Sequence, residues 1–193
     1  MTIFEPMTLI TDYLLAGVTG WLGWRLQASS ERSQRWWALA FAALALGAFL
    51  GGTWHGLFQN ALLWKATVLA VGVASFGMVV GSAIATLSGA ARYVIVTVVL
   101  AKLVVYCAWI MMRDDFIFVI VDTGIAFALV AALHLRRFNG WILAGVAVSV
   151  VAALVQASGL ALHRHFNHND LYHVIQIAAM ALLYKGARRL RDA

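Results

Sequence analysis

Three of the six histidines could be brought to one metal ion although they lie far apart in the chain. His55 ends one apolar stretch, His173 stands near the start of another, and His168 precedes His173 by five residues. Catalytic zinc sites use three protein ligands and leave the fourth position to a water molecule, whose pKa falls to about 7. We therefore expect His55, His168 and His173 to be metal ligands, with Zn²⁺ as the cofactor.

Two aspartates and a threonine are expected to supply the other catalytic groups. Asp12 and Asp122 lie within apolar stretches, where a carboxylate is costly and usually faces a wet cavity or the interior of a helix bundle. Either one could orient a metal ligand or act as the general base toward a bound water. Thr53, or alternatively Tyr172, is expected to polarise the carbonyl group of a substrate.

The elements that position these residues are predicted to be membrane-spanning helices. Of the 193 residues, 63% are hydrophobic and 11% are charged, whereas soluble domains average about 45–50% and about 25%. A helix that crosses a hydrocarbon core needs roughly 20 apolar residues. The sequence therefore predicts an all-α integral membrane protein, a single seven-helix transmembrane domain over residues 1–193. The predicted spans are Pro6–Leu26, Trp36–Phe58, Ala61–Leu87, Tyr93–Met112, Phe116–Leu135, Gly140–Leu162 and Leu171–Lys185.

In this arrangement most of the acids and histidines gather at one depth of the membrane. Glu5, Thr8 and Asp12 follow one another at i, i+3 and i+7 and share one face of the first span. Only His134 is predicted near the opposite membrane face, and Lys102 falls near the middle of its span. This concentration at one depth is the strongest functional signal in the sequence.

The distribution of positive charge predicts the orientation of the chain. Cytoplasmic loops carry an excess of Lys and Arg, and most of the 14 Lys and Arg residues fall in one set of loops. We therefore expect the N-terminus outside, the C-terminus in the cytoplasm and the polar cluster in the outer leaflet. The residues of this basic set are Arg25, Arg32, Arg35, Arg92, Arg136, Arg137, Lys185, Arg188, Arg189 and Arg191.

Composition also bears on several functional classes. The net charge of +6 does not indicate a nucleic-acid partner, because the basic residues are spread over short loops. A single cysteine, Cys107, excludes an internal disulfide. The apolar first span lacks a basic leader and is predicted to be retained rather than cleaved as a signal peptide. Tryptophans near the span ends are predicted to lie at the membrane interface: Trp24, Trp36, Trp37, Trp64, Trp109 and Trp141.

Together, these features resemble the CREST superfamily of seven-transmembrane hydrolases, which includes the alkaline ceramidases and the progestin and adiponectin receptors. In that family one histidine of the second span and a His-x-x-x-His motif of the seventh hold zinc, and a serine and an aspartate complete the site. His55 and His173 match two of these histidines. Asn169 stands at the first motif position, and Gly51 stands at the serine. The family aspartate of the third span has no counterpart, so Asp12 or Asp122 would replace it.

The resemblance implies a zinc-dependent hydrolase that acts on a lipid amide or ester at the outer leaflet. The small size and the lack of organelle signals indicate a bacterial-type inner membrane. A proton-coupled transporter is the main alternative, with Asp12, Asp122, Lys102 and Lys65 forming an ion path. Independently of function, Asp12 and Asp122 could instead be buried structural partners of Lys102 or Lys65. A haem protein ligated by His55 and His173, or a lipid sensor that uses the same cavity, are further alternatives.

Overall fold

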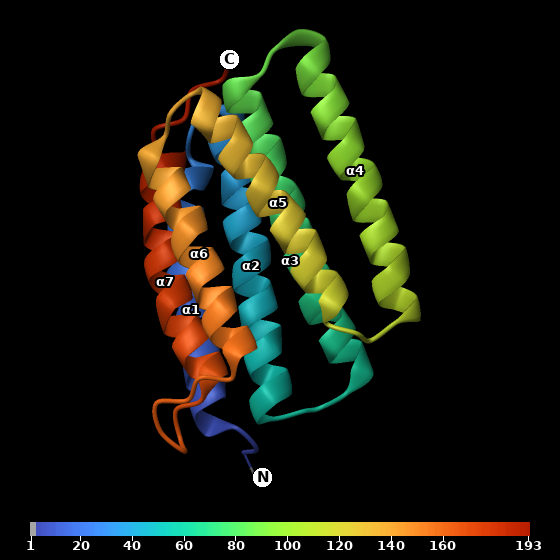
Figure 1. The fold of residues 1–193 in the computed structure, drawn as a ribbon, viewed down its shortest axis with the longest axis vertical. Coiled ribbons are helices and arrows are strands. Elements are labelled where there is room, and N and C mark those ends of the chain that lie inside the picture. The colour runs from blue at the N-terminus through green and yellow to red at the C-terminus, as the bar shows by residue number, and fades with distance from the viewer. Residues whose placement is uncertain (1–2) are drawn as a thin grey trace.

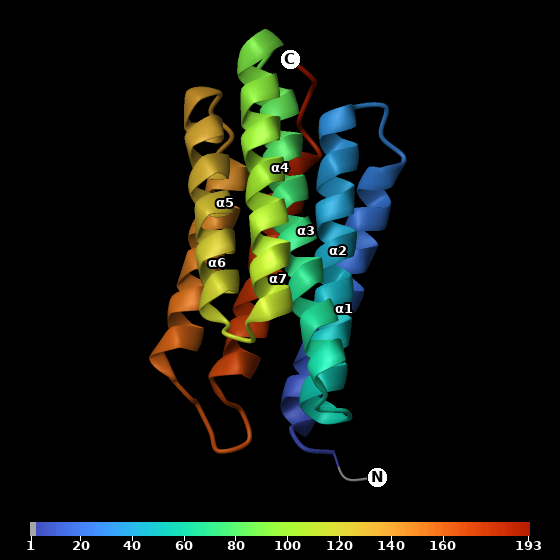
Figure 2. The same cartoon turned by 90° about the vertical axis from the view of Figure 1, so that its right-hand side faces the viewer.

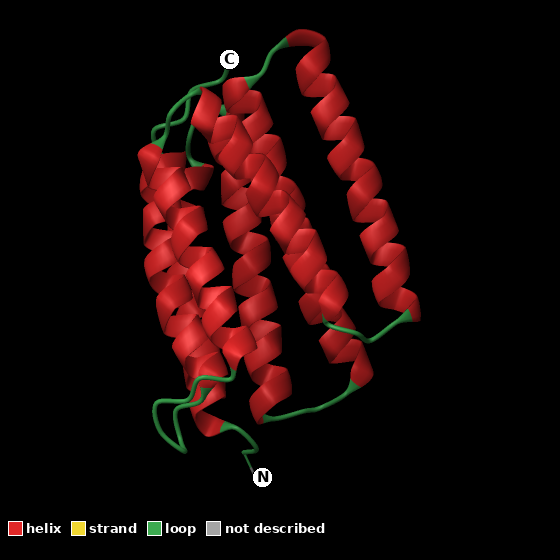
Figure 3. Ribbon diagram, in the orientation of Figure 1, coloured by secondary structure: helices red, strands yellow, loops and turns green. Residues whose placement is uncertain are grey.

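The computed structural model describes residues 3–193 as seven helices joined by short loops (Figure 1). Figure 3 shows helices along nearly all of the chain and no strand within residues 3–193. The helices run alternately up and down along the long axis of the molecule. Their bounds are α1 Pro6–Gln27, α2 Arg32–Gly56, α3 Ala61–Thr86, α4 Gly89–Met112, α5 Ile117–Arg136, α6 Gly140–Ser158 and α7 His168–Ala187.

Five of the seven helices, α2 to α6, are long and apolar enough to cross a membrane. The apolar helices therefore indicate a membrane protein. The two remaining helices, α1 and α7, bury several polar side chains, among them Asp12 and Thr19 in α1 and His173 and Gln176 in α7. At a rise of 1.5 Å per residue, 22 residues of α1 and 20 of α7 are about 33 and about 30 Å long.

Helix α3 lies in the middle of the bundle, whereas α4 lies at its side. Most of α3 is buried because α2, α4 and α5 all pack on it. Only Val99, Tyr106 and Ile110 of α4 are buried, and Figures 1 and 2 show α4 standing beside α3 and α5. The first and last helices pack against each other, so α7 closes the bundle onto α1.

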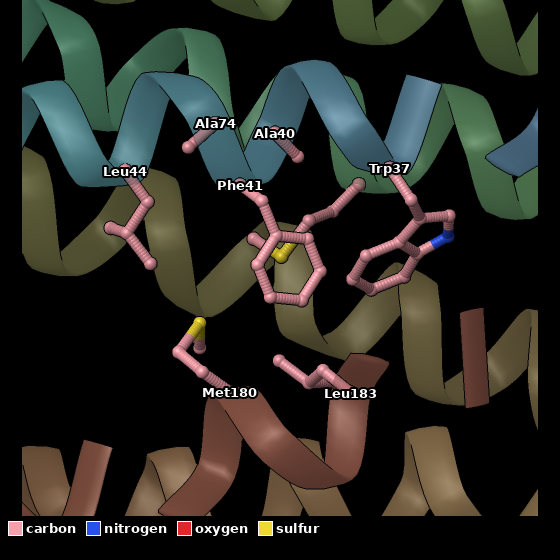
Figure 4. Close-up of a pocket in the computed structure, with 8 residues that line it drawn as sticks. Trp37, Ala40, Phe41, Leu44, Ala74, Met180 and Leu183 are labelled. Atoms are coloured by element: carbon pink, nitrogen blue, oxygen red, sulfur yellow. The ribbon is translucent and has the colours of Figure 1, made fainter. Parts of the chain in front are cut away.

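The apolar core contains one tryptophan that the sequence places elsewhere. Trp37 is fully buried, and Figure 4 shows it with Phe41 on α2, facing Met180 and Leu183 of α7. The predicted interfacial position of Trp37 is therefore wrong. The indole fits because Gly81 of α3 has no side chain: a Cβ there would lie 2.7 Å from Trp37 Cδ1. Two other tryptophans, Trp24 and Trp109, are exposed.

Local capping decides where the helices around the site begin and end. Asn167 accepts hydrogen bonds from the backbone N–H groups of Asn169 and Asp170, and Asp170 accepts one from Asn167 N, which forms a capping box. Helix α7 therefore begins at His168, three residues before the predicted start. Helix α6 ends at Ser158 because Gly159 adopts a left-handed conformation (φ 69°).

The C-terminal tail caps a helix that is distant in the sequence. Asp192 accepts hydrogen bonds from Ser33 N (2.9 Å) and Arg32 N (3.1 Å) at the start of α2. Glu31 in turn accepts from Asp192 N (2.8 Å) and Arg191 Nη1 (3.0 Å). Partial burial raises the pKa of Asp192, but the bonds from Ser33 and Arg32 outweigh burial and hold this pKa below its usual value.

We predict that Asp192→Ala destabilises the protein by about 1 kcal/mol at pH 7, the usual cost of a lost N-cap. The folded-state pKa of Asp192 is depressed, so its contribution is complete above the unfolded value of about 3.9 and is lost as the pH falls through the lower folded value. Thermal unfolding in detergent at pH 7 and near pH 2.5 measures both effects. Asp114→Ala is the control, and an equal loss at both pH values would contradict the prediction.

Candidate functional site

A buried carboxylate and a buried histidine meet between α1 and α7, at the end of the bundle where α1 begins. Asp12 Oδ1 lies 3.1 Å from His173 Nε2, and both side chains are buried. A buried charged group is costly unless it is paired. The contact joins the first helix to the last and brings together two residues that are 161 positions apart.

The second ring nitrogen of His173 contacts a hydroxyl group. Thr11 Oγ1 lies 3.0 Å from His173 Nδ1, with Thr8 O at 3.2 Å and Asp170 Oδ1 at 3.4 Å as longer alternatives for its proton. A hydroxyl donates one proton at a time, and the imidazole nitrogen is the nearest acceptor. The three side chains therefore form a line of hydroxyl, imidazole and carboxylate.

Thr11 is a residue that sequence reasoning missed. A threonine in an apolar helix most often bonds to a carbonyl of the preceding turn, so its type carried no signal. Only its position next to Asp12 could have pointed to it, since two adjacent residues of one helix lie about 100° apart. In the structure they contact the two sides of one imidazole ring.

A second histidine–carboxylate contact lies nearer the end of the bundle. His55 Nδ1 is 3.4 Å from Glu5 Oε1, and Thr8 Oγ1 donates to Glu5 Oε2 at 3.2 Å. The His55 contact is too long for a good hydrogen bond, and Glu5 is partly exposed. The shared face of α1 that the sequence predicts for Glu5, Thr8 and Asp12 thus points toward the same region between α1, α2 and α7.

Close packing of α2 against α1 fixes the position of Asp12. A Cβ at Gly52 would lie 2.7 Å from Asp12 Cβ, so only glycine allows the two backbones to come this close. One residue earlier, a Cβ at Gly51 would lie 3.9 Å from Asp12 Oδ2. Position 51, where the CREST pattern has serine, therefore faces the Asp12 carboxylate.

The structure does not bring His168 to His173. His168 is the first residue of α7, and five residues of a helix separate two side chains by about 140° around its axis. Asn169, four residues before His173, instead accepts a hydrogen bond from Gln156 Nε2 at 3.1 Å.

The residues present do not make a three-ligand zinc site. Residues 3–193 contain no group of three or more His, Cys, Asp or Glu side chains placed to hold a metal ion. Both ring nitrogens of His173 already have polar contacts, to Thr11 and Asp12. Catalytic zinc needs three protein donors, and the Asp12–His173 contact offers two. The zinc set of His55, His168 and His173 remains a prediction.

Asp122 lies in a different cluster. Its carboxylate pairs with Lys102 of α4, and Lys102 Nζ also donates to Asp122 O at 3.3 Å. Asp122 Oδ2 is buried and has no hydrogen-bond partner within residues 3–193. Lys65 pairs with Asp114 and donates to Met111 O at 2.9 Å. The ion pair between Lys102 and Asp122 is the structural alternative that the sequence left open.

Thr53 is engaged within α2 and with α1. Its hydroxyl donates to Phe49 O at 2.7 Å and lies 3.0 Å from the hydroxyl of Tyr13. Neither contact involves the imidazole of His173. Tyr172, the alternative to Thr53, packs edge-on against the His173 ring with centroids 5.2 Å apart.

Fold and site together define an all-helical membrane protein that buries a hydroxyl–imidazole–carboxylate line at one end. The chain belongs to DUF6962, a family of unknown function, whose pattern it matches over residues 7–192. Comparisons with the curated proteins and with the solved structures gave no match.

We predict that Lys102→Met destabilises the protein by about 3–5 kcal/mol, because it leaves the Asp122 carboxylate buried and unpaired. The double variant Lys102→Met/Asp122→Leu removes both charges and should recover most of this loss. Lys65→Met is the matched control, since Lys65 pairs with the exposed Asp114 and should cost less than about 1 kcal/mol. Thermal unfolding in detergent measures all three; equal losses for Lys102→Met and the double variant would count against the prediction.

From the two donors of the site we expect well under one zinc per chain. Elemental mass spectrometry checks this on detergent-purified protein that has met neither a nickel column nor a chelator. One tightly bound zinc per chain, lost in His173→Ala but kept in His163→Ala, would show that the side chains rearrange around an ion. That result would support the predicted zinc site.

Proposed function

We propose that the protein is a membrane-embedded hydrolase that cleaves a lipid amide or ester at the end of the bundle where α1 begins. The observation that carries the proposal is the line from Thr11 through His173 to Asp12, with contacts of 3.0 and 3.1 Å. A hydroxyl next to a base that a third group orients is the general arrangement of an activated nucleophile.

In the proposed reaction His173 acts first as a base and then as an acid. Thr11 Oγ attacks the carbonyl carbon of the lipid while its proton passes to His173 Nδ1. Asp12 orients the ring through Nε2–H and stabilises the imidazolium that forms. The proton on Nδ1 then passes to the leaving amine or alcohol. A water molecule, deprotonated by the same nitrogen, then attacks the acyl carbon; the fatty acid leaves as Thr11 Oγ takes the proton back from Nδ1.

The location of the site favours a lipid substrate over a soluble one. The exposed residues of α1 and α7 around it include the large apolar side chains of Ile10, Leu14 and Val174, and Phe4 just before α1 is also exposed. Thr11 and Asp12 lie about one and a half turns into α1. At that depth below the membrane surface a lipid presents the carbonyl groups of its ester or amide links.

The proposal includes a seven-span topology with the N-terminus outside and the C-terminus in the cytoplasm of a bacterial-type inner membrane. Helices α1 and α7 run beside the five apolar helices for most of their length (Figures 1 and 2), which supports seven crossings. The predicted basic set lies in the helix ends, loops and tail at the end of the bundle that holds the C-terminus, and this excess supports a cytoplasmic location for that end.

The CREST resemblance supports the hydrolase class without supplying its mechanism. His55 and His173 match two histidines of the family pattern in sequence, whereas Gly51 stands where that pattern has a serine. Gly51 and His173 both face Asp12. The transporter alternative needs a polar path between the ends of the bundle. Among residues 3–193 no hydrogen bond joins the Asp12–His173 contact to the Lys102–Asp122 pair.

An alkyl fluorophosphonate tests the proposal, because an activated hydroxyl displaces its fluoride and keeps the phosphonyl group. We expect the adduct on Thr11, located by mass spectrometry of peptides. His173→Gln and Asp12→Asn should slow labelling at least about 100-fold, the usual range for loss of a general base. Thr11→Ser should still be labelled, and Thr11→Val should not.

The matched control is Thr19→Val, because Thr19 is a buried threonine of the same helix whose hydroxyl has no partner within residues 3–193. It should be labelled like the wild type. The proposal fails if neither wild type nor Thr11→Ser takes up the probe at position 11 under conditions that label a known serine hydrolase. It also fails if Thr11→Val releases fatty acid from lipid amides and esters at the wild-type rate.

A further inference from the structure

The opposite end of the bundle holds a pocket that the proposed reaction does not use. It has a volume of about 250 Å³ and lies between the C-terminal ends of α3 and α5. Small-molecule sites usually measure about 300–1,000 Å³, so this pocket has room for a small polar group and not for a whole lipid. Its lining residues are Thr86, Leu87, Leu133, Arg136 and Arg137.

Two adjacent arginines make the pocket positive, and no acidic residue lines it. Arg137 is held over the end of α3, since its Nη1 donates to Ala85 O at 3.3 Å. A guanidinium has five N–H donors, so this bond leaves most of them free for a ligand. The guanidinium of Arg136 has no hydrogen-bond partner within residues 3–193, and its side chain is exposed.

A third arginine, Arg92 of α4, bonds to the backbone of Leu87, one of the residues that line the pocket. Arg92 Nε and Nη2 both donate to Leu87 O, at 2.9 and 2.7 Å, and Nη2 also donates to Ala193 O at 2.5 Å. These bonds occupy the backbone carbonyl of Leu87, one of the hydrogen-bond acceptors among the lining residues. With this acceptor occupied, the two arginines of the lining favour a negative group over a cation.

Exposed apolar side chains flank the two arginines. Leu135 and Phe138 stand immediately before and after the pair, and they are 65% and 81% exposed. Apolar side chains this exposed beside arginines are typical of the membrane–water boundary, where the charges reach the headgroups and the apolar groups reach the acyl chains. An anion that reaches the pocket from the membrane would arrive attached to acyl chains.

We propose that this pocket binds the headgroup phosphate of an acidic phospholipid through Arg136 and Arg137, with the acyl chains lying along Leu135 and Phe138. Arginine pairs well with phosphate because its fork of donors contacts two oxygens at once. Basic pockets between transmembrane helices are known to take anionic headgroups.

Native mass spectrometry of the intact protein in neutral detergent tests this, with phosphatidylglycerol, phosphatidylcholine and inorganic phosphate as probes. We expect phosphatidylglycerol to remain bound at least tenfold more tightly than phosphatidylcholine. Arg136→Gln/Arg137→Gln should lose this preference. Arg188→Gln/Arg189→Gln is the matched control: it removes the same charge at the same end, where both side chains lie over aromatic rings of Tyr184 and Trp141.

Equal losses in the two double variants would overturn the proposal in favour of a general charge effect, and wild-type binding by Arg136→Gln/Arg137→Gln would overturn it directly. Displacement of the lipid by millimolar inorganic phosphate, with phosphate bound in its place, would assign the pocket to free phosphate instead. If the double variant does not fold, Arg136→Gln alone decides, because it breaks no hydrogen bond among the described residues; it should weaken lipid binding several-fold, and unchanged binding refutes the proposal.

Discussion

The contact between Asp12 and His173 is the interaction on which the arrangement of the bundle depends. A membrane offers no water to a buried carboxylate or imidazole, so each side chain must find its partner inside the protein. Asp12 is on the first helix and His173 on the last. The need to satisfy both groups therefore closes α7 onto α1 and sets the register at which the two helices meet.

This constraint also explains why α1 and α7 are less apolar than the five helices between them. Their polar side chains have partners on adjacent helices. Thr11 of α1 contacts His173 and Asp170 of α7, and Gln176 of α7 donates to Ser149 of α6. Hydrophobicity alone would leave such helices weakly held in lipid. The glycine contact between Gly52 and Asp12 then presses α2 onto the same place, so three helices fix one carboxylate.

The sequence could predict the helices and the position of Asp12 and His173 near one end of the bundle, but not the helix faces that meet. Runs of about 20 apolar residues indicate that helices form. Successive residues of a helix point about 100° apart, so a shift of one residue changes which side chain faces a neighbouring helix. His168 could therefore be predicted as a ligand, because the sequence alone does not show that Asn167 caps α7 and makes His168 its first residue. The pairing of Asp122 with Lys102, the burial of Trp37 behind Gly81 and the role of Thr11 all depend on which neighbours face each helix. A single sequence does not contain that information in any local pattern.

The bonds that join the two ends of the chain have a consequence for its biosynthesis. Asp12 is synthesised long before His173, and the first turn of α2 waits for Asp192 to cap it. Until the rest of the chain is made, the Asp12 carboxylate lacks its partner and the start of α2 has open N–H groups. A chain that stalls before α7 would expose both defects, and a membrane protease could distinguish it from a finished one by the loose first helix alone.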